Sequence, residues 1–310
     1  MQRHVSVLLQ EAVDALAIKP DGTYVDLTLG RAGHSAAILS KLRGGHLYAF
    51  DLDAEAIKES QSRLQEIGDG FTLIHASFAN VASELASRGV TEVDGILADL
   101  GVSSPQFDDA ERGFSYRFDA RLDMRMDQGS PFSAYDVVNT YPLPRLAEVL
   151  RDYGDEPDAY RIAKAIVKAR EKAPIETTFQ LVDLIKGCKS SKALAKKGHP
   201  AKQTFQALRI EVNQEQAALQ TMLAEAPSLL RKGGRLAIIT FMSLDDRTVK
   251  KAFASLSVIE GERHGIALRP EQLEEPEFET LTHKPILPSA EELSSNPRSA
   301  SAKLRVLVKK

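Results

Sequence analysis

The sequence predicts an α/β protein in which a parallel, doubly wound sheet carries an inserted all-helical domain. In the first third of the chain, short apolar segments bounded by turn residues alternate with amphipathic segments, and strands that alternate with helices form parallel sheets. No strand signal is found between about residues 105 and 205, and a buried strand follows at 235–241. We therefore assign residues 1–105 and 206–310 to the sheet domain and residues 106–205 to the insert.

Four strands and two helices are expected before the insert. The strands are expected at residues 24–29, 47–51, 71–75 and 95–99, and the helices at 33–42 and 54–67. The last of these strands is short, apolar and bounded by turn signals, which is typical of a strand buried on both faces.

Capping residues divide the insert into four helices. Ser133 can cap the first, Pro144 opens the second, Pro157 fits the first turn of the third, and Thr178 starts the fourth. Beyond the insert we expect a helix at 203–230, a turn at 232–234, a strand at 235–241, a helix at 245–254 and a final strand at 303–308.

The composition is that of a soluble globular protein. Of 310 residues, 43% are hydrophobic and 27% are charged, which is ordinary for such a chain. No apolar run approaches the length of a membrane span, and the N-terminus lacks the layout of a signal peptide. The one cysteine, Cys188, cannot form an internal disulfide, and no Cys/His cluster has zinc-ligand spacing. We expect a cytoplasmic protein without a bound metal.

Positive charge is concentrated in one part of the chain. Residues 161–209 contain twelve Lys and Arg and three acidic residues, a local net charge of +9, whereas the whole chain has a net charge of −3. Such segregation is typical of a surface that faces phosphates. Lysine-rich helix faces that serve only to contact water are the alternative interpretation.

A glycine-containing turn follows the first expected strand. Gly30 and Gly33 lie between that strand and the next helix, and Asp51 ends the following strand, 21 residues after Gly30. Glycines allow a ligand to approach the backbone, and an acidic side chain at this distance accepts hydrogen bonds from a ribose. Tight packing of the turn is the alternative, but with Asp51 a nucleoside-containing cofactor is favoured. The dinucleotide motif G-x-G-x-x-G lacks its first glycine here, and no Walker motif is present.

The stretch from Asp94 to Asp127 is the most informative part of the chain. Its apolar run ends on Asp99, near the carboxyl end of a strand, where open α/β sheets bind their ligands. The loop that follows is long and rich in aromatic residues and methionine. We therefore expect it to be an ordered lid or binding surface rather than a linker.

Several segments of the chain resemble the RsmH/MraW family. These segments are DGILADLGVSSPQ, RGFSY, LDMRMD, TFQALRIEVN, SLDDR and NPRSASAKLRV, and the resemblance extends from His4 to about Val308. The family consists of S-adenosylmethionine-dependent methyltransferases that act on a cytosine N4 of small-subunit ribosomal RNA. The resemblance implies a Rossmann-like S-adenosylmethionine-dependent methyltransferase sheet, with the helical insert recognising the substrate. It implies 16S rRNA or the small ribosomal subunit as partner, and leaves a homodimer open.

The resemblance also implies which residues contact the cofactor. The matching positions are Ala32, Gly33, His34, Asp51, Phe78, Asp99 and Gln106. Phe78 is equally interpreted as an ordinary core aromatic, and His34 as a polar residue at a helix start.

The chemistry of amine methylation suggests further residues. The lone pair of a cytosine amine is delocalised into the ring, so the enzyme has to hold the amine with acceptors and align it with the methyl donor. Asp99 is the candidate acceptor, and Ser103 and Ser104 offer further oxygen atoms. The base would stack on Phe107, Phe114 or Tyr116. Candidate RNA contacts are Phe114, Tyr116, Lys196, Lys197, Arg209, Arg247 and Arg298. Methylation at carbon 5 would need a cysteine nucleophile, and Cys188 does not follow a strand.

Five differences from the family pattern leave a second hypothesis open. Ala32 replaces a glycine, Lys202-Gln203 replace Thr-Arg, Met242 replaces a histidine, Asp245 replaces a glutamate, and Ala300 replaces an arginine. The chain could therefore be a degenerate paralogue that binds the ribosome or RNA with weak or no methyl transfer. An oxidoreductase is disfavoured, because the glycines that would bind a pyrophosphate are absent. The segments TFQALRI and SLDDR could also serve only to hold helices to the sheet.

Overall fold

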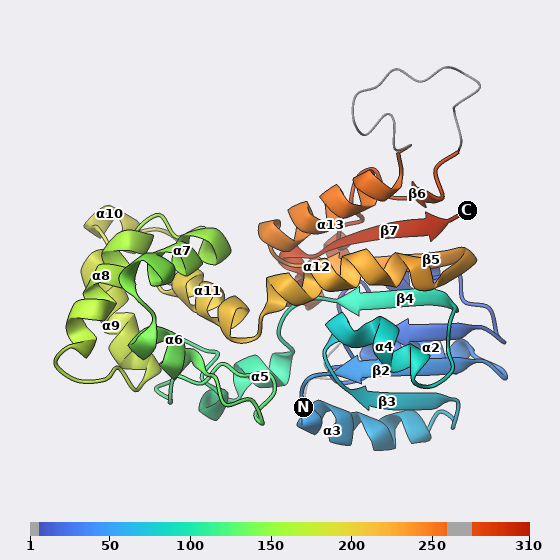
Figure 1. Ribbon diagram of the computed structural model, residues 1–310, viewed down its shortest axis with the longest axis horizontal. Coiled ribbons are helices and arrows are strands. Elements are labelled where there is room, and N and C mark those ends of the chain that lie inside the picture. The colour runs from blue at the N-terminus through green and yellow to red at the C-terminus, as the bar shows by residue number, and fades with distance from the viewer. Residues whose placement is uncertain (1–5, 259–274) are drawn as a thin grey trace. The chain divides into compact units, whose positions relative to one another are not determined.

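The computed structural model describes residues 6–258 and 275–310, which belong to two compact units (Figure 1). The first, here called the sheet unit, comprises residues 1–101 and 217–310, and the second, the helical unit, comprises residues 102–216. The predicted boundaries at 105/106 and 205/206 thus both lie inside the helical unit. Helix α11 (Lys202–Val212) packs on α7 (Leu143–Gly154) and α6 (Ala134–Thr140), so the whole of α11 belongs to that unit.

The sheet has seven strands in the order β3-β2-β1-β4-β5-β7-β6. The strands are β1 (Thr23–Asp26), β2 (His46–Asp51), β3 (Phe71–His75), β4 (Val93–Asp99), β5 (Leu230–Thr240), β6 (Phe278–Thr280) and β7 (Lys303–Lys309). The first five are parallel, whereas β7 runs antiparallel to both β5 and β6. The sheet is therefore mixed, and the expectation of a parallel sheet is confirmed only for β1 to β5.

The strand order reverses at β1, which pairs with β2 on one side and β4 on the other. The connections after these strands leave in opposite directions, so a crevice can form at their carboxyl ends. The doubly wound, Rossmann-like α/β architecture predicted from the sequence is confirmed.

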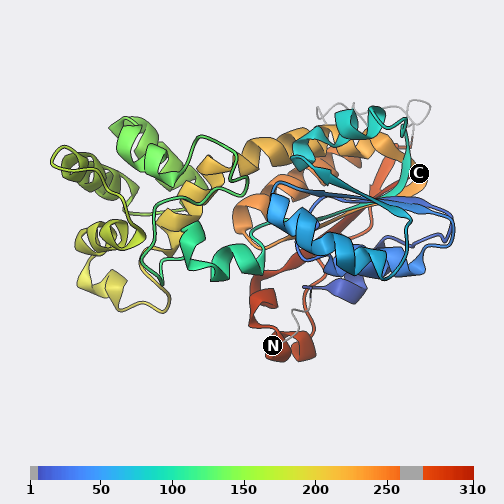
Figure 2. The same cartoon turned by 90° about the horizontal axis from the view of Figure 1, so that it is seen from below.

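Helices cover both faces of the sheet (Figure 2). The helices of this unit are α1 (Leu9–Ala15), α2 (Gly33–Lys41), α3 (Ala54–Gln65), α4 (Val81–Ala86), α13 (Ser243–Leu256) and α15 (Ala290–Ser295), and α12 (Glu215–Glu225) enters it from the helical unit. Alternate residues of a strand face opposite sides of a sheet. Ile96 and Ala98 accordingly belong to the apolar core that includes residues of α4, α12 and α13, and Leu97 belongs to the core that includes residues of α1 and α2.

The chain beyond the insert differs from the expected elements in two places. The helix expected at 203–230 is broken, because Gln214 has a left-handed backbone (φ 51°) between α11 and α12. The turn expected at 232–234 lies within β5, where Gly233 has φ 80° and the ladder with β4 shifts register.

The helical unit has its own apolar core. Its helices are α5 (Ser104–Asp108), α6, α7, α8 (Ala159–Arg170), α9 (Thr178–Cys188), α10 (Ser191–Leu194) and α11. Ser133 caps α6 in a capping box with Asp136, as predicted, and Thr177 forms the equivalent box with Gln180 before α9. Leu122 and Met124, from the loop after Asp99, are fully buried in this core. That loop is therefore ordered, as its apolar residues suggested. Among the described helices, none is long and apolar enough to cross a membrane.

Candidate active site

The turn after β1 is built on a left-handed backbone at two positions. Gly30 has φ 48° and Ala32 has φ 56°. Glycine adopts this conformation without a steric penalty, whereas another L-residue is strained by about 1–2 kcal/mol. The glycine that the RsmH/MraW pattern has in place of Ala32 is thus explained by backbone geometry, and alanine adopts the same turn at a small cost.

Asp26, at the end of β1, holds this turn together and is itself fully buried. Its carboxylate accepts hydrogen bonds from the Ser35 hydroxyl at 2.6 Å and from the backbone N–H of Thr28 at 3.1 Å. The Thr28 hydroxyl in turn accepts from the backbone N–H of Asp99 at 2.6 Å. Asp26, Thr28 and Ser35 were not predicted as site residues, although Asp26 does interrupt the apolar run of its strand.

Asp51 lies at the carboxyl end of β2, directly beside the turn. Its two oxygens accept from the backbone N–H groups of Gly30 and Asp53, each at 2.8 Å. A carboxylate has about four acceptor positions, so Asp51 can accept further bonds from the hydroxyls of a ligand. Burial raises the pKa of Asp51 to about 6, against the lowering effect of these two hydrogen bonds.

Phe78 follows at the same edge of the sheet. The register between β2 and β3 pairs Asp51 with His75, and Phe78 begins a short 3₁₀ turn three residues later. The ring is partly buried against the apolar core. Both interpretations of Phe78, as a contact of the adenine and as a core aromatic, are compatible with this position.

Asp99 ends β4 and faces His34 at the start of α2. The distance between Asp99 Oδ2 and His34 Nδ1 is 3.7 Å, and the Asp99 side chain is 23% exposed. Its other oxygen, Oδ1, is buried and has no hydrogen-bond partner among the described residues. Burial raises the pKa of Asp99 to about 6, and the nearby Asp26 adds to this rise while His34 opposes it.

The side chains at the carboxyl ends of β1, β2 and β4 determine which kind of ligand can bind there. Asp26, Asp51 and Asp99 are all acidic and lie at the ends of three adjacent strands. Carboxylates bind hydroxyl groups and cations and repel phosphates. The set therefore fits a nucleoside with a positive charge, such as S-adenosylmethionine, and fits the pyrophosphate of a dinucleotide poorly.

Three of the predicted catalytic and cofactor residues belong to the helical unit. Ser103 and Ser104 stand directly before and at the start of α5, and the backbone N–H of Ser103 donates to Oε1 of Gln106 at 3.1 Å. Gln106 is 5% exposed. Within the sheet unit, five predicted residues lie close together: Ala32, Gly33, His34, Asp51 and Asp99. Ser103, Ser104 and Gln106 belong to the helical unit and are not part of that set.

The three aromatic residues predicted to stack on a base differ in accessibility, and Phe107 is half-buried. Phe114 is 4% exposed in the core of the helical unit, with the Arg112 guanidinium 5.9 Å from its ring centre. It is therefore a core residue in this structure, and stacking of a base on it would require the core to open. Tyr116 is partly exposed and stacks on His199, with ring centres 4.2 Å apart.

The predicted RNA-contacting cations also divide into two kinds. Lys196, Lys197 and Arg247 are exposed, as is Arg298 on the loop before β7. Arg209 instead forms a bidentate pair with Glu215, at 2.7 and 2.8 Å, and is 14% exposed. Arg209 therefore stabilises the junction of α11 and α12 within the helical unit, which is a structural role but not the contact between helix and sheet that was the alternative for TFQALRI.

The basic segment 161–209 is less uniformly exposed than its charge suggests. Lys189 is 5% exposed and pairs with the buried Glu156, outside the segment. The guanidinium of Arg170 donates to the backbone oxygens of Val138 and Tyr141. Eight lysines of the segment are exposed, namely Lys164, Lys168, Lys172, Lys186, Lys192, Lys196, Lys197 and Lys202.

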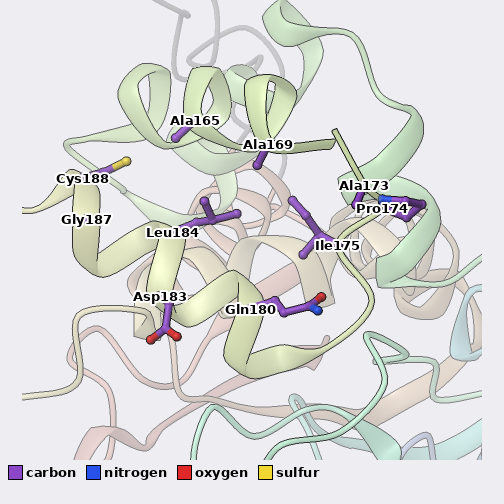
Figure 3. Close-up of a pocket in the computed structure, with 10 residues that line it drawn as sticks. All are labelled: Ala165, Ala169, Ala173, Pro174, Ile175, Gln180, Asp183, Leu184, Gly187 and Cys188. Atoms are coloured by element: carbon purple, nitrogen blue, oxygen red, sulfur yellow. The ribbon is translucent and has the colours of Figure 1, made fainter. Parts of the chain in front are cut away.

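A groove of about 630 Å³ lies between α8 and α9 (Figure 3). Ala165, Ala169 and Leu184 line it, and Cys188 lies at one end. It contains none of the predicted cofactor residues. Burial raises the pKa of the Cys188 thiol, so the thiol stays protonated near neutral pH and is a poor nucleophile.

The strand order defines a Rossmann-like α/β fold, and the carboxylates at the carboxyl ends of its strands are compatible with a nucleoside ligand. The chain belongs to the MraW methylase family, whose model matches residues 1–310, and the molecule is therefore a methyltransferase. This confirms the resemblance to the RsmH/MraW family.

Two relatives are similar to this chain over their whole length. One, from Exiguobacterium sibiricum, is named ribosomal RNA small subunit methyltransferase H and is 52% identical over 309 residues, covering 100% of this chain and 99% of the relative. A protein of the same name from Streptococcus dysgalactiae subsp. equisimilis is 52% identical over 309 residues, covering 99% and 97%. Among solved structures, an rRNA methylase from Streptococcus thermophilus is 14% identical with a TM-score of 0.41, covering 99% of this chain and 98% of that one.

Proposed function

We propose that this chain transfers a methyl group from S-adenosylmethionine to the exocyclic N4 of a cytidine in 16S rRNA, in the cytoplasm. The observation that carries this proposal is the pair of carboxylates, Asp51 and Asp99, at the carboxyl ends of β2 and β4, in a chain 52% identical to proteins named small-subunit rRNA methyltransferase H.

The cofactor would be held along the edge of the sheet. The backbone of Ala32, Gly33 and His34 would approach it, Asp51 would accept from the ribose hydroxyls, and Phe78 would lie near the adenine. S-adenosylmethionine supplies a methyl group activated on a positively charged sulfur. Gln106 is the remaining cofactor contact that the family motifs imply.

Asp99 would act on the amine of the substrate. The Asp99 side chain is 23% exposed although its Oδ1 atom is buried, so the exposed part of the carboxylate would accept a hydrogen bond from the amino group. An acceptor at this place orients the amine and favours the charge that develops on nitrogen. Ser103 and Ser104 would add acceptors from the start of α5.

The helical unit would recognise the RNA. Its eight exposed lysines would contact phosphates, and Tyr116 would offer an aromatic ring to the target base or a neighbouring one. Arg247 and Arg298 would add contacts from the sheet unit.

The test is mass spectrometry of small-subunit rRNA from a strain that lacks the gene. We expect one N4-methylcytidine to be lost and to return with the wild-type gene but not with Asp99→Asn. An unchanged rRNA would contradict the proposal. Assays of the purified enzyme on naked rRNA and on assembled subunits then identify the form of the substrate.

A degenerate paralogue is the second candidate, because Ala32 adopts a backbone that favours glycine and Met242 replaces a histidine of the family motif. Calorimetry separates the two: heat of binding with S-adenosylmethionine supports the enzyme, and its absence supports the paralogue.

A further inference from the structure

His34 is held from two sides at the start of α2. Its Nε2 lies 3.1 Å from the backbone oxygen of Val7, and its Nδ1 lies 3.7 Å from Asp99 Oδ2. The ring is 4% exposed. These contacts all lie within the sheet unit, and Val7 was not singled out by its sequence.

The contact with Val7 fixes the tautomer of His34. A backbone carbonyl only accepts hydrogen bonds, so Nε2 has to carry the proton. In the neutral ring Nδ1 then has a lone pair, and that lone pair faces the carboxylate of Asp99. Two unprotonated acceptors face each other unless one of them gains a proton.

The segment that carries Val7 is packed tightly against the same turn. A Cβ atom on Gly33 would lie 1.8 Å from the Ser6 hydroxyl oxygen, and the backbone N–H of Leu8 donates to Glu292 of α15 at 2.9 Å. The position of the Val7 carbonyl, and with it the orientation of His34, is therefore determined by packing on both sides.

We propose that His34 and Asp99 form one proton-accepting pair, in which Asp99 takes the proton that the amine loses and His34 is the positioning residue that sets how strongly it is taken. The inference rests on the proposed function. After the methyl group is on nitrogen, an N–H bond breaks, its electron pair returns to nitrogen, and an O–H bond forms on the Asp99 carboxylate. The pair releases that proton to solvent before the next turnover.

The surroundings of the pair support this role. Asp26 on β1 and His34 on α2 are the charged or titratable groups that act on Asp99 among the described residues. Burial and Asp26 raise the pKa of Asp99, which makes it a better proton acceptor at neutral pH than an exposed aspartate. His34, whose Nδ1 lies 3.7 Å from Asp99 Oδ2, opposes this rise.

The direct test is an NMR titration of the protein without ligand. We expect the ¹³C shift of the Asp99 carboxyl group and the ¹⁵N shifts of His34 to change together, with Nε2 protonated throughout. Asp99→Asn should abolish the change in the His34 ¹⁵N shifts that accompanies protonation of Asp99. Asp69→Asn, at the opposite end of the strands, is the matched control and should leave His34 unchanged. If the Asp99 and His34 shifts of the wild-type protein change over separate pH ranges, the proposal is wrong, and this result needs no variant.

Kinetics separate proton transfer from cofactor binding. His34→Gln keeps an N–H for Val7 and loses the titratable ring. We expect a shift in the acid limb of the kcat profile, with the calorimetric affinity for S-adenosylmethionine changed less than about threefold. If His34 is only a cofactor contact, the affinity of His34→Gln for S-adenosylmethionine falls and the acid limb of its kcat profile does not move. That result would contradict the proposed pair of His34 and Asp99. If the shifts of Asp99 and His34 change together but the enzyme does not methylate cytidine, the proposed function is wrong and the proposed pair still stands.

Discussion

Asp51 and Asp99 are kept in surroundings that oppose their negative charge. Burial raises the pKa of each from 3.8 to about 6. Because the folded-state pKa is raised, the stabilising contribution of each group is complete below pH 3.8 and is lost as the pH rises through about 6. At neutral pH both carboxylates therefore reduce the stability of the fold, a cost that a ligand with hydroxyl groups and a positive charge would offset.

Asp51→Asn should weaken the binding of S-adenosylmethionine by about 10-fold or more at pH 7, as expected for hydrogen bonds to a charged group. In the wild type the affinity should fall as the pH drops from 7 to 5, because protonation removes the charge of Asp51, whereas the variant should lose this part of the pH dependence. Calorimetry at both pH values measures this. Asp69→Asn is the control and should behave as the wild type; equal affinities of all three proteins would disprove the ribose contact.

At the scale of elements, α13 is joined to β7 by buried charges. Asp246 accepts from Arg305 at 2.7 Å and from Lys303 at 3.0 Å, and the Arg305 side chain is 6% exposed. This contact favours the interpretation that the SLDDR segment holds its helix to the sheet. The charged pairs hold the pKa of Asp246 below its usual value.

Asp246→Asn should therefore destabilise the protein by about 3–5 kcal/mol at pH 7, because Arg305 is left buried without its partner charge. The pKa of Asp246 is lowered in the folded state, so its contribution is present above pH 3.8 and is lost as the pH falls through the lowered value. The difference in free energy of unfolding should accordingly shrink in acid. Urea denaturation measures both effects, and Glu277→Gln, which breaks the exposed pair with Lys309, should cost less than about 1 kcal/mol.

A second tie lies within the helical unit. The side chain of Asn213, at the end of α11, accepts from the Met126 N–H and donates to the Met124 oxygen, both at 2.7 Å. The side chain of Asn213 thus joins the family segments LDMRMD and TFQALRIEVN by two hydrogen bonds.

Asn213→Ala should expose the loop around Met126 to solvent. We expect the backbone amide of Met126 to exchange its hydrogen about fivefold faster, since one buried hydrogen bond contributes about 1 kcal/mol. Hydrogen-exchange mass spectrometry measures this, with Gln214→Ala as a neighbouring control. Unchanged protection at Met126 would show that the loop is held by its apolar residues alone.

The sequence predicted those elements that have strong local signals. The strand at 71–75 has the predicted bounds, and Asp51 and Asp99 were found because they end apolar strands. The break at Gln214 was missed because Asn213 is held there by the distant Met124 and Met126, which no local pattern reveals. The burial of Phe114 and the role of Asp26 were missed for the same reason, since both depend on contacts between segments far apart in the chain.

At the scale of the molecule, charge divides the chain into two parts. The segment 161–209 has a net charge of +9 within a chain of net charge −3, and eight of its lysines are exposed. A protein of this kind should bind RNA through phosphates without adhering to nucleic acid over its whole surface.

Reversal of charge at Lys196 and Lys197, to glutamate, should raise the KM for the RNA substrate and make the turnover less sensitive to salt. Each lost phosphate contact reduces the slope of log affinity against log salt by about one unit. Methyl transfer measured over a range of salt concentrations tests this. Lys250→Glu with Lys251→Glu, also exposed but on α13, is the matched control, and a flat salt response of the wild type would argue against the basic surface.

The position of the insert between β4 and β5 has a consequence for synthesis of the chain. β4 is paired on one side by β1, but its other neighbour begins only at Leu230. While the ribosome makes residues 102–229, an apolar edge of the nascent sheet has no partner, and such edges recruit other chains. The helical unit, with a core of its own, can condense during that interval, so the second half of the sheet arrives last and closes the molecule.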